Sequence, residues 1–125
     1  MPVADQERAR TFFVDVLGHE PVADFRYAGD ERWLEVAPAG AATRLSLARR
    51  DAGAPVAAET GVTFVSDDVE AEHARLRDAG VDVDAAILRE GDPPVRWAHT
   101  TLAGIPAMFR LRDPDGNSFL VVQQV

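Results

Sequence analysis

The sequence contains no cysteine and no long apolar run. Without cysteine the 125-residue chain forms no disulfide, binds no metal through a thiolate and has no thiol nucleophile, which fits a reducing compartment. No apolar stretch has the roughly 20 residues that a membrane helix needs, and the first residues lack an apolar signal segment. We therefore expect a cytoplasmic protein without a membrane partner.

Cations are also scarce. There are 13 lysine and arginine residues against 21 acidic residues, and the net charge is −8. Phosphate backbones bind basic surfaces, so nucleic acid is not an expected partner. What the chain does have is a hydrophobic content of 46% in 125 residues, the size of one compact unit. We expect a single domain over residues 1–125.

The segment from Arg112 to Val122 predicts a tight turn between two apolar strands. Pro114 presets φ, Asp115 and Asn117 can satisfy local backbone groups, and Gly116 tolerates positive φ. The chain should reverse here before a strand over residues 118–123.

The first half reads as a helix followed by three strands. Asp5 is a suitable N-cap, apolar residues recur at helical spacing up to Leu17, and Gly18 stands where a helix often ends. Residues 21–26, 32–37 and 43–48 are strand-like and separated by turn-like segments, which predicts an antiparallel meander.

The second half repeats this order. Residues 61–66 form a predicted strand, Asp67 or Asp68 caps a helix that runs through Leu76, and Gly80 closes it. Strands are expected at residues 81–88, 106–111 and 118–123, with a polar loop over residues 90–103. The chain thus contains two βαβββ modules, about residues 1–50 and 58–125. Neither module can bury both faces of its sheet, so together they should form one cupped sheet with a cavity for a small molecule.

The helix segment from Asp5 to Gly18 and the turn at Gly116 resemble the vicinal oxygen chelate superfamily, which includes glyoxalases, bleomycin resistance proteins and dioxygenases. The resemblance covers nearly the whole chain and is greatest to small bacterial glyoxalase-like proteins. It implies an α+β fold in which the two modules form a cupped, incomplete barrel-like sheet with helices outside. The first strand, before Asp5, is expected to be truncated.

In that superfamily the cup carries metal ligands at four inward positions, usually His, Glu or Asp. Here the first position falls before Met1, and the second falls at Arg44 to Ser46. The third coincides with Gly61 and the fourth with Leu120, neither of which has a side chain that binds a metal. We expect no metal and no other cofactor. The three histidines are scattered, with His19 after a helix end, His73 predicted to be solvated on the second helix, and His99 in the polar loop.

Alternation along the strands predicts which side chains face the cup. Leu45 and Leu47 should pack under one helix, and Phe109 and Leu111 under the other. Their strand neighbours Arg44, Ser46, Met108 and Arg110 then face the cavity. The two arginines, Arg44 and Arg110, would favour an anionic ligand there. Each arginine has an alternative, a nearby carboxylate, and Glu35 is a candidate for Arg44.

The loop at residues 95–101 combines an indole, a guanidinium and an imidazole that could stack on a planar ligand. Trp97 has a second interpretation, that it covers an edge of the core. His99 is the one histidine that we would test as a general acid or base, and a plain loop histidine is the alternative. The residues expected to bind a ligand are Arg44, Ser46, Thr63, Trp97, His99, Met108, Arg110 and Leu120.

Two functions follow from these features. The first is a metal-independent small-molecule-binding protein that sequesters an acidic or aromatic compound. The alternative is a lyase, isomerase or oxygenase-type enzyme of the same superfamily, using His99 and the cavity arginines or a rearranged metal site. In either case a short first strand exposes a sheet edge, and we expect a homodimer.

Overall fold

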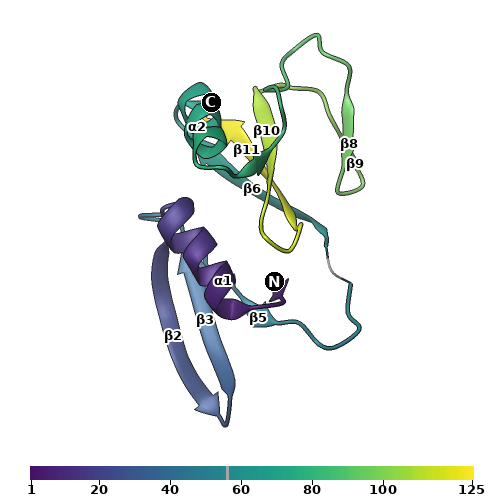
Figure 1. Ribbon diagram of the computed structural model, residues 1–125. Coiled ribbons are helices and arrows are strands. Elements are labelled where there is room, and N and C mark those ends of the chain that lie inside the picture. The colour runs from purple at the N-terminus through teal and green to yellow at the C-terminus, as the bar shows by residue number, and fades with distance from the viewer. Residues whose placement is uncertain (56) are drawn as a thin grey trace. The chain divides into compact units, whose positions relative to one another are not determined.

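The computed structural model describes residues 1–55 and 57–125, which form two compact units, Met1–Val56 and Ala57–Val125. Each unit contains helical segments and β-strands (Figure 1). The predicted α+β class, with two successive modules of one helix and several strands, is confirmed.

Unit 1 consists of a helix and a small antiparallel sheet in the order β2-β3-β4, as the predicted meander requires. The first strand is short, as expected, and pairs in parallel with β5. The elements of this unit are β1 (Pro2–Val3), α1 (Gln6–Arg10), the π-helix η1 (Thr11–Val16), β2 (Glu20–Ala28), β3 (Glu31–Ala37), β4 (Leu45–Ser46) and β5 (Ala48–Arg49).

The first helix begins where the sequence predicts but changes type after Arg10, when the α-helix has made less than two turns. Asp5 caps it by accepting a hydrogen bond from the backbone N–H of Arg8 at 3.0 Å. From Thr11 onward the turns widen, and the N–H of Leu17 bonds the carbonyl of Phe12, five residues back, at 2.9 Å. Local patterning does not distinguish such a π segment from an α-helix.

The core of unit 1 lies between this helix and the sheet. Val3, Phe13, Leu34, Val36 and Leu47 are each at most 1% exposed. Leu47 is therefore packed as predicted, and Leu45 shares its face because it is the cross-strand partner of Val36.

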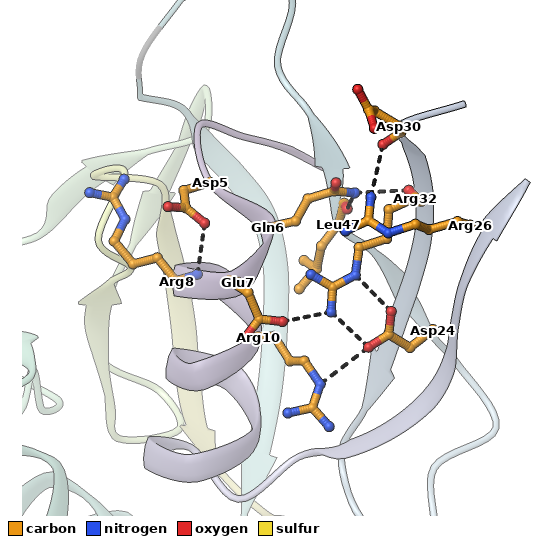
Figure 2. A network of polar contacts seen from close by, with 10 residues as sticks. All are labelled: Asp5, Gln6, Glu7, Arg8, Arg10, Asp24, Arg26, Asp30, Arg32 and Leu47. Carbon is orange, nitrogen blue, oxygen red and sulfur yellow. Dashed lines mark hydrogen bonds and ion pairs between the residues drawn. The ribbon is translucent and has the colours of Figure 1, made fainter. Parts of the chain in front are cut away.

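An arginine-centred network ties the helix to β2 and β3 (Figure 2). Arg32 donates from Nε and Nη2 to the two carboxylate oxygens of Asp24, both at 2.7 Å, and from Nη2 to Glu7 at 2.7 Å. Gln6 adds hydrogen bonds from Nε2 to the carbonyls of Arg32 and Leu47, both at 2.9 Å. Three elements are thereby joined by polar contacts at one edge of the core.

Unit 2 has a four-stranded sheet in the order β6-β11-β10-β7 and a separate β8–β9 hairpin. In Figure 1 the sheet lies between α2 and this hairpin. The hairpin occupies the segment predicted to be a polar loop, and the strand predicted over residues 81–88 is reduced to β7 and a bridge from Leu88 to Met108. The elements are β6 (Glu59–Ser66), α2 (Val69–Asp78), β7 (Asp82–Val83), β8 (Val95–Trp97), β9 (Thr100–Leu102), β10 (Met108–Arg112) and β11 (Ser118–Gln123).

Helix α2 covers one face of this sheet. Asp68, rather than Asp67, is the N-cap and accepts from the N–H of Ala71 at 3.0 Å. His73 is buried, at 6% exposed, and its ring meets Phe109 edge-on at 4.9 Å, so the prediction of a solvated histidine was wrong. Its Nε2 lies 2.7 Å from the carbonyl oxygen of Asp84, which supplies the polar contact that a buried imidazole needs.

The turn between β10 and β11 forms as predicted, with Gly116 at φ 82° and its N–H bonded to the carbonyl of Asp113 at 2.9 Å. The buried Asp113 carboxylate accepts from the backbone N–H groups of Asp115 and Asn117, both at 2.9 Å. The side-chain oxygen Oδ1 of Asn117 accepts a hydrogen bond from the N–H of Ala58 at 3.1 Å. The turn therefore also anchors the start of unit 2.

Candidate functional site

The face of the unit 2 sheet opposite α2, here called the open face, changes from polar to apolar along its strands. Cross-strand partners point to the same side, so the register arranges this face in three rows. A polar row crosses all four strands, a middle row contains one cation, and an apolar row ends at the Leu88 bridge. The rows are Glu59, Ser118, Arg112 and Asp82; then Thr63, Leu120 and Arg110; then Val65, Val122, Met108 and Leu88.

The register of these rows depends on an irregularity in β6. Glu59 and Thr63 are four residues apart, whereas their partners Ser118 and Leu120 are two apart, so β6 bulges between them. Gly61 lies in this bulge at φ 73°, a conformation that other residues adopt only with strain. The bulge brings Glu59 into the polar row.

The β8–β9 hairpin places Trp97 on the open face. The indole is 4% exposed and packs on Met108 and Leu120, and its Nε1 donates to Ser118 Oγ at 2.8 Å. The interpretation that Trp97 covers part of the core is therefore confirmed. Trp97 is also among the residues that line a cavity, which only a small exposed part of the residue reaches.

The tip of the hairpin is strained. Ala98 and His99 both have positive φ, 47° and 62°, as a two-residue type I′ turn requires, but neither is Gly, Asn or Asp. The N–H of Ala98 donates to Glu59 Oε1 at 3.2 Å. The tip is thereby held on the polar row, close to the indole contact.

A cavity of about 270 Å³ opens where the hairpin, the open face and the β10–β11 turn meet. Its volume lies just below the range of about 300–1,000 Å³ for small-molecule sites, so it limits a ligand to a small size. The wall includes one indole, two guanidiniums, one carboxylate and one hydroxyl. Its lining residues are Ala57, Ala58, Glu59, Trp97, Arg110, Arg112, Gly116 and Ser118.

The two guanidiniums are held from behind by one carboxylate. Arg110 donates from Nε to Asp84 Oδ2 at 2.8 Å, and Arg112 donates from Nη2 to Asp84 Oδ1 at 2.8 Å. Burial acts to raise the pKa of Asp84, but the hydrogen bonds from both arginines outweigh it, so this pKa lies below its usual value. Among the described residues nothing accepts from the two Nη groups of Arg110, which lines the cavity.

The predicted site residues of unit 2 fall in three places. Trp97 and Arg110 line the cavity, and their contact with a ligand stays a prediction. Met108 and Leu120 lie on the same face but are covered by the indole, and Thr63 is exposed beside Leu120. His99 sits at the exposed hairpin tip and is not among the residues that line the cavity.

The two predicted site residues of unit 1 lie near Glu35. Ser46 is the cross-strand partner of Glu35, and Arg44 forms an ion pair with it at 3.5 Å. The alternative that Arg44 pairs with Glu35 is thus confirmed, and the Arg44 side chain is 53% exposed.

The sequence reasoning missed four polar residues of the site. Arg112 and Ser118 could have been found by period-two alternation from Arg110 and Leu120. Glu59 was missed because the strand was predicted to begin at Gly61, two residues late. Asp84 gives no local signal, because its role depends on side chains 26 and 28 residues away.

The metal positions implied by the superfamily do not fit a divalent ion. Gly61 has no side chain, and Leu120 is packed under Trp97. Ser46 and the ion-paired Arg44 are not usual metal ligands. Within residues 1–55 and 57–125, no three His, Cys, Asp or Glu side chains are grouped so that they could hold a metal ion.

In the same part of the chain no helix has the length and apolar character to cross a bilayer.

Comparison with known proteins agrees with this architecture. Residues 1–121 match the model of the Glyoxalase/Bleomycin resistance protein/Dioxygenase superfamily. An uncharacterized protein of Bacillus subtilis (strain 168), YetH, is 26% identical over 121 residues, which cover 95% of this chain and 89% of that protein.

Two solved structures are similar over essentially the full chain. TnmS3, an antibiotic binding protein from Streptomyces sp. CB03234, is 34% identical, with a TM-score of 0.71 and coverage of 100% of this chain and 91% of its own. A member of the same superfamily from Sphaerobacter thermophilus DSM 20745 is 25% identical, with a TM-score of 0.75 and coverage of 99% and 94%. The sequence motifs, the repeated module and these matches lead to one conclusion: the chain belongs to the glyoxalase/bleomycin resistance protein/dioxygenase superfamily.

Proposed function

We propose that this protein binds and sequesters a small acidic, aromatic compound in the cavity of unit 2, without a metal ion. The observation that carries the proposal is the combination of an indole and two guanidiniums on one wall of a cavity of about 270 Å³. The small exposed part of the indole can contact the edge of a planar ring, and a guanidinium binds carboxylates in a bidentate manner.

Arg110 is the expected anion contact. Asp84 occupies its Nε, which fixes the direction of the side chain, and leaves its two Nη groups for a ligand. Arg112 is engaged more fully, since its Nη2 contacts Asp84 at 2.8 Å and its Nη1 lies 3.5 Å from Asp82. A carboxylate in the cavity would therefore bind Arg110 first.

Similarity supports binding as a role of this protein. TnmS3, described as an antibiotic binding protein, is 34% identical to this chain over its full length. The side chains at the superfamily's metal positions do not include a usual set of ligands, which supports a metal-independent mode.

The proposal is tested by equilibrium binding with Trp97 as the reporter. The sequence has two tryptophans, so Trp33→Phe leaves the indole at the cavity as the single emitter. A panel of one- and two-ring aromatic carboxylates and their neutral amides should give saturable fluorescence changes with the acids, and weaker changes with the amides.

Arg110→Met should weaken binding of the acids by about 10- to 100-fold, because a hydrogen bond to a charged group contributes about 1.5–3 kcal/mol. Arg77→Met is the matched control, since Arg77 is 60% exposed on α2 beside Asp78. Saturable binding to no member of the panel, or equal losses in the two variants, would refute the proposal.

We also propose that the protein is a homodimer that buries the aromatic surface of β2 and β3. Phe25 and Trp33 are cross-strand partners and are 53% and 40% exposed, and Tyr27 is 60% exposed. These side chains present about 300 Å², a substantial part of the roughly 800 Å² that each partner buries in a standard interface. Sedimentation equilibrium should show a dimer that Phe25→Ser converts to a monomer, and a monomeric wild type at micromolar concentration would contradict this.

A further inference from the structure

The polar row places opposite charges at two sides of the cavity. Glu59 on β6, Ser118 on β11 and Arg112 on β10 are successive cross-strand neighbours. Strands in a sheet lie about 4.8 Å apart and alternate residues of one strand about 6.7 Å apart, so the Cα atoms of Glu59 and Arg110, which lies one row further along β10, are about 12 Å apart. A ligand that contacts both residues must therefore use two separate ends.

The Glu59 carboxylate is oriented without being neutralised. Its Oε1 accepts the N–H of Ala98 at the strained hairpin tip, at 3.2 Å. Among the described residues no arginine pairs with Glu59, and no group donates to its Oε2. One oxygen is therefore available in the cavity to a ligand that carries a donor or a positive charge.

The charges at the wall are balanced. Arg110 and Arg112 bring two positive charges, and Asp84 and Glu59 bring two negative ones, while Asp82 is 71% exposed at the outer edge. A simple anion would gain the Arg110 contact but would also feel the Glu59 carboxylate. A zwitterion can pair with both side chains, because its negative charge complements Arg110 and its positive charge complements Glu59.

We infer that Glu59 makes this cavity selective for amphoteric aromatic compounds, which carry a carboxylate for Arg110 and a protonated amine for Glu59. The inference rests on the proposed function and narrows its ligand class. In this arrangement Arg110 supplies anion binding, the exposed part of Trp97 borders the ring, and Glu59 determines the preference between acids and amino acids.

Three one-ring probes of nearly equal size separate these contributions: 4-(aminomethyl)benzoate, 4-methylbenzoate and 4-methylbenzylamine. Binding is measured on the Trp33→Phe protein by Trp97 fluorescence and checked by calorimetry. The zwitterion should bind about tenfold more tightly than 4-methylbenzoate, and the amine should bind most weakly.

Glu59→Gln keeps the carbonyl oxygen that accepts from Ala98 but removes the charge. This variant should bind the zwitterion more weakly and 4-methylbenzoate with equal or higher affinity. The preference for the zwitterion should therefore fall from about tenfold to near unity. A merely structural role of Glu59 would weaken both probes equally. Glu90→Gln makes the same chemical change at an exposed loop position outside the cavity lining and should leave the preference intact.

The outcomes separate this inference from the proposed function. If 4-(aminomethyl)benzoate and 4-methylbenzoate bind equally tightly and both need Arg110, the proposed acid-binding function stands. The inferred preference for amphoteric compounds is then rejected. An unchanged preference in Glu59→Gln also rejects it. If none of the three probes and no member of the carboxylate panel binds, both proposals fall.

Discussion

Replacing Asp84 by asparagine should reveal how much the paired arginines of the cavity depend on one carboxylate. Asp84 accepts from Arg110 Nε and Arg112 Nη2, both at 2.8 Å, and from the backbone N–H of Arg110 at 3.1 Å. Asn has nearly the same shape, but its NH₂ group cannot accept, and it has no charge to offset two guanidiniums.

The expected loss of stability depends on how far Asp84, Arg110 and Arg112 are buried. A hydrogen bond to a charged group contributes about 1.5–3 kcal/mol when shielded from water, and an exposed ion pair contributes less than about 1 kcal/mol. The side chains of Asp84, Arg110 and Arg112 are 21%, 23% and 27% exposed, which places each contact between these limits. We expect Asp84→Asn to lower the free energy of unfolding by about 2 kcal/mol.

The difference in unfolding free energy between the wild type and Asp84→Asn should decrease as the pH falls. The arginine hydrogen bonds hold the pKa of Asp84 below its usual value in the folded state, despite burial. The stabilisation is therefore complete above the unfolded pKa of about 3.9 and is lost as the pH falls through the lower folded value. Protonated Asp84 resembles Asn, so the two proteins should converge in acid.

Urea unfolding followed by circular dichroism, at several pH values from 7 to 3, measures this difference. Asp78→Asn is the control, since Asp78 is 74% exposed beside Arg77 and should change stability by less than 0.5 kcal/mol. The reasoning is refuted if Asp84→Asn costs no more than the control at pH 7, or if its cost is the same at pH 3.

Two further changes test other parts of the molecule. Arg32→Met should destabilise unit 1 by about 1–2 kcal/mol, because three hydrogen bonds at 2.7 Å are lost from a side chain 12% exposed, while their acceptors Asp24 and Glu7 are 32% and 68% exposed (Figure 2). The Arg32 hydrogen bond lowers the pKa of Asp24, so in urea titrations this cost should be present at pH 7 and fade in acid; a cost independent of pH would contradict the assignment. His99→Gly should stabilise the protein by about 0.5–1 kcal/mol, because glycine accepts positive φ without strain. A lower Tm, or weaker binding of the acidic probes, would show that His99 contributes more than a turn.

Features that depend on a few neighbouring residues were predictable. Asp5 and the Asp67–Asp68 pair marked helix starts, since a cap needs only its own first turn. The turn around Gly116 followed from local chemistry, and alternation assigned Phe109 to the helix side and Arg110 to the open face. The resemblance to the superfamily rested on these same local motifs.

Features that depend on distant partners were not predictable. The segment around Trp97 lacks the Asn or Gly of a typical two-residue hairpin, and burial of the indole on Met108 and Leu120 accompanies a strained turn there. His73 stands among charged residues in the sequence, yet the carbonyl of Asp84 allows it to be buried.

The sequence by itself determined the family, the repeated module and the two sides of each strand, because each of these is encoded in local spacing. Tertiary structure decided the site. Asp84 meets Arg110 and Arg112, and Glu59 joins Ser118, because strand order and one β-bulge bring residues dozens of positions apart onto the same row. Which charges remain available to a ligand depends on these pairings, and no local pattern in the sequence records them.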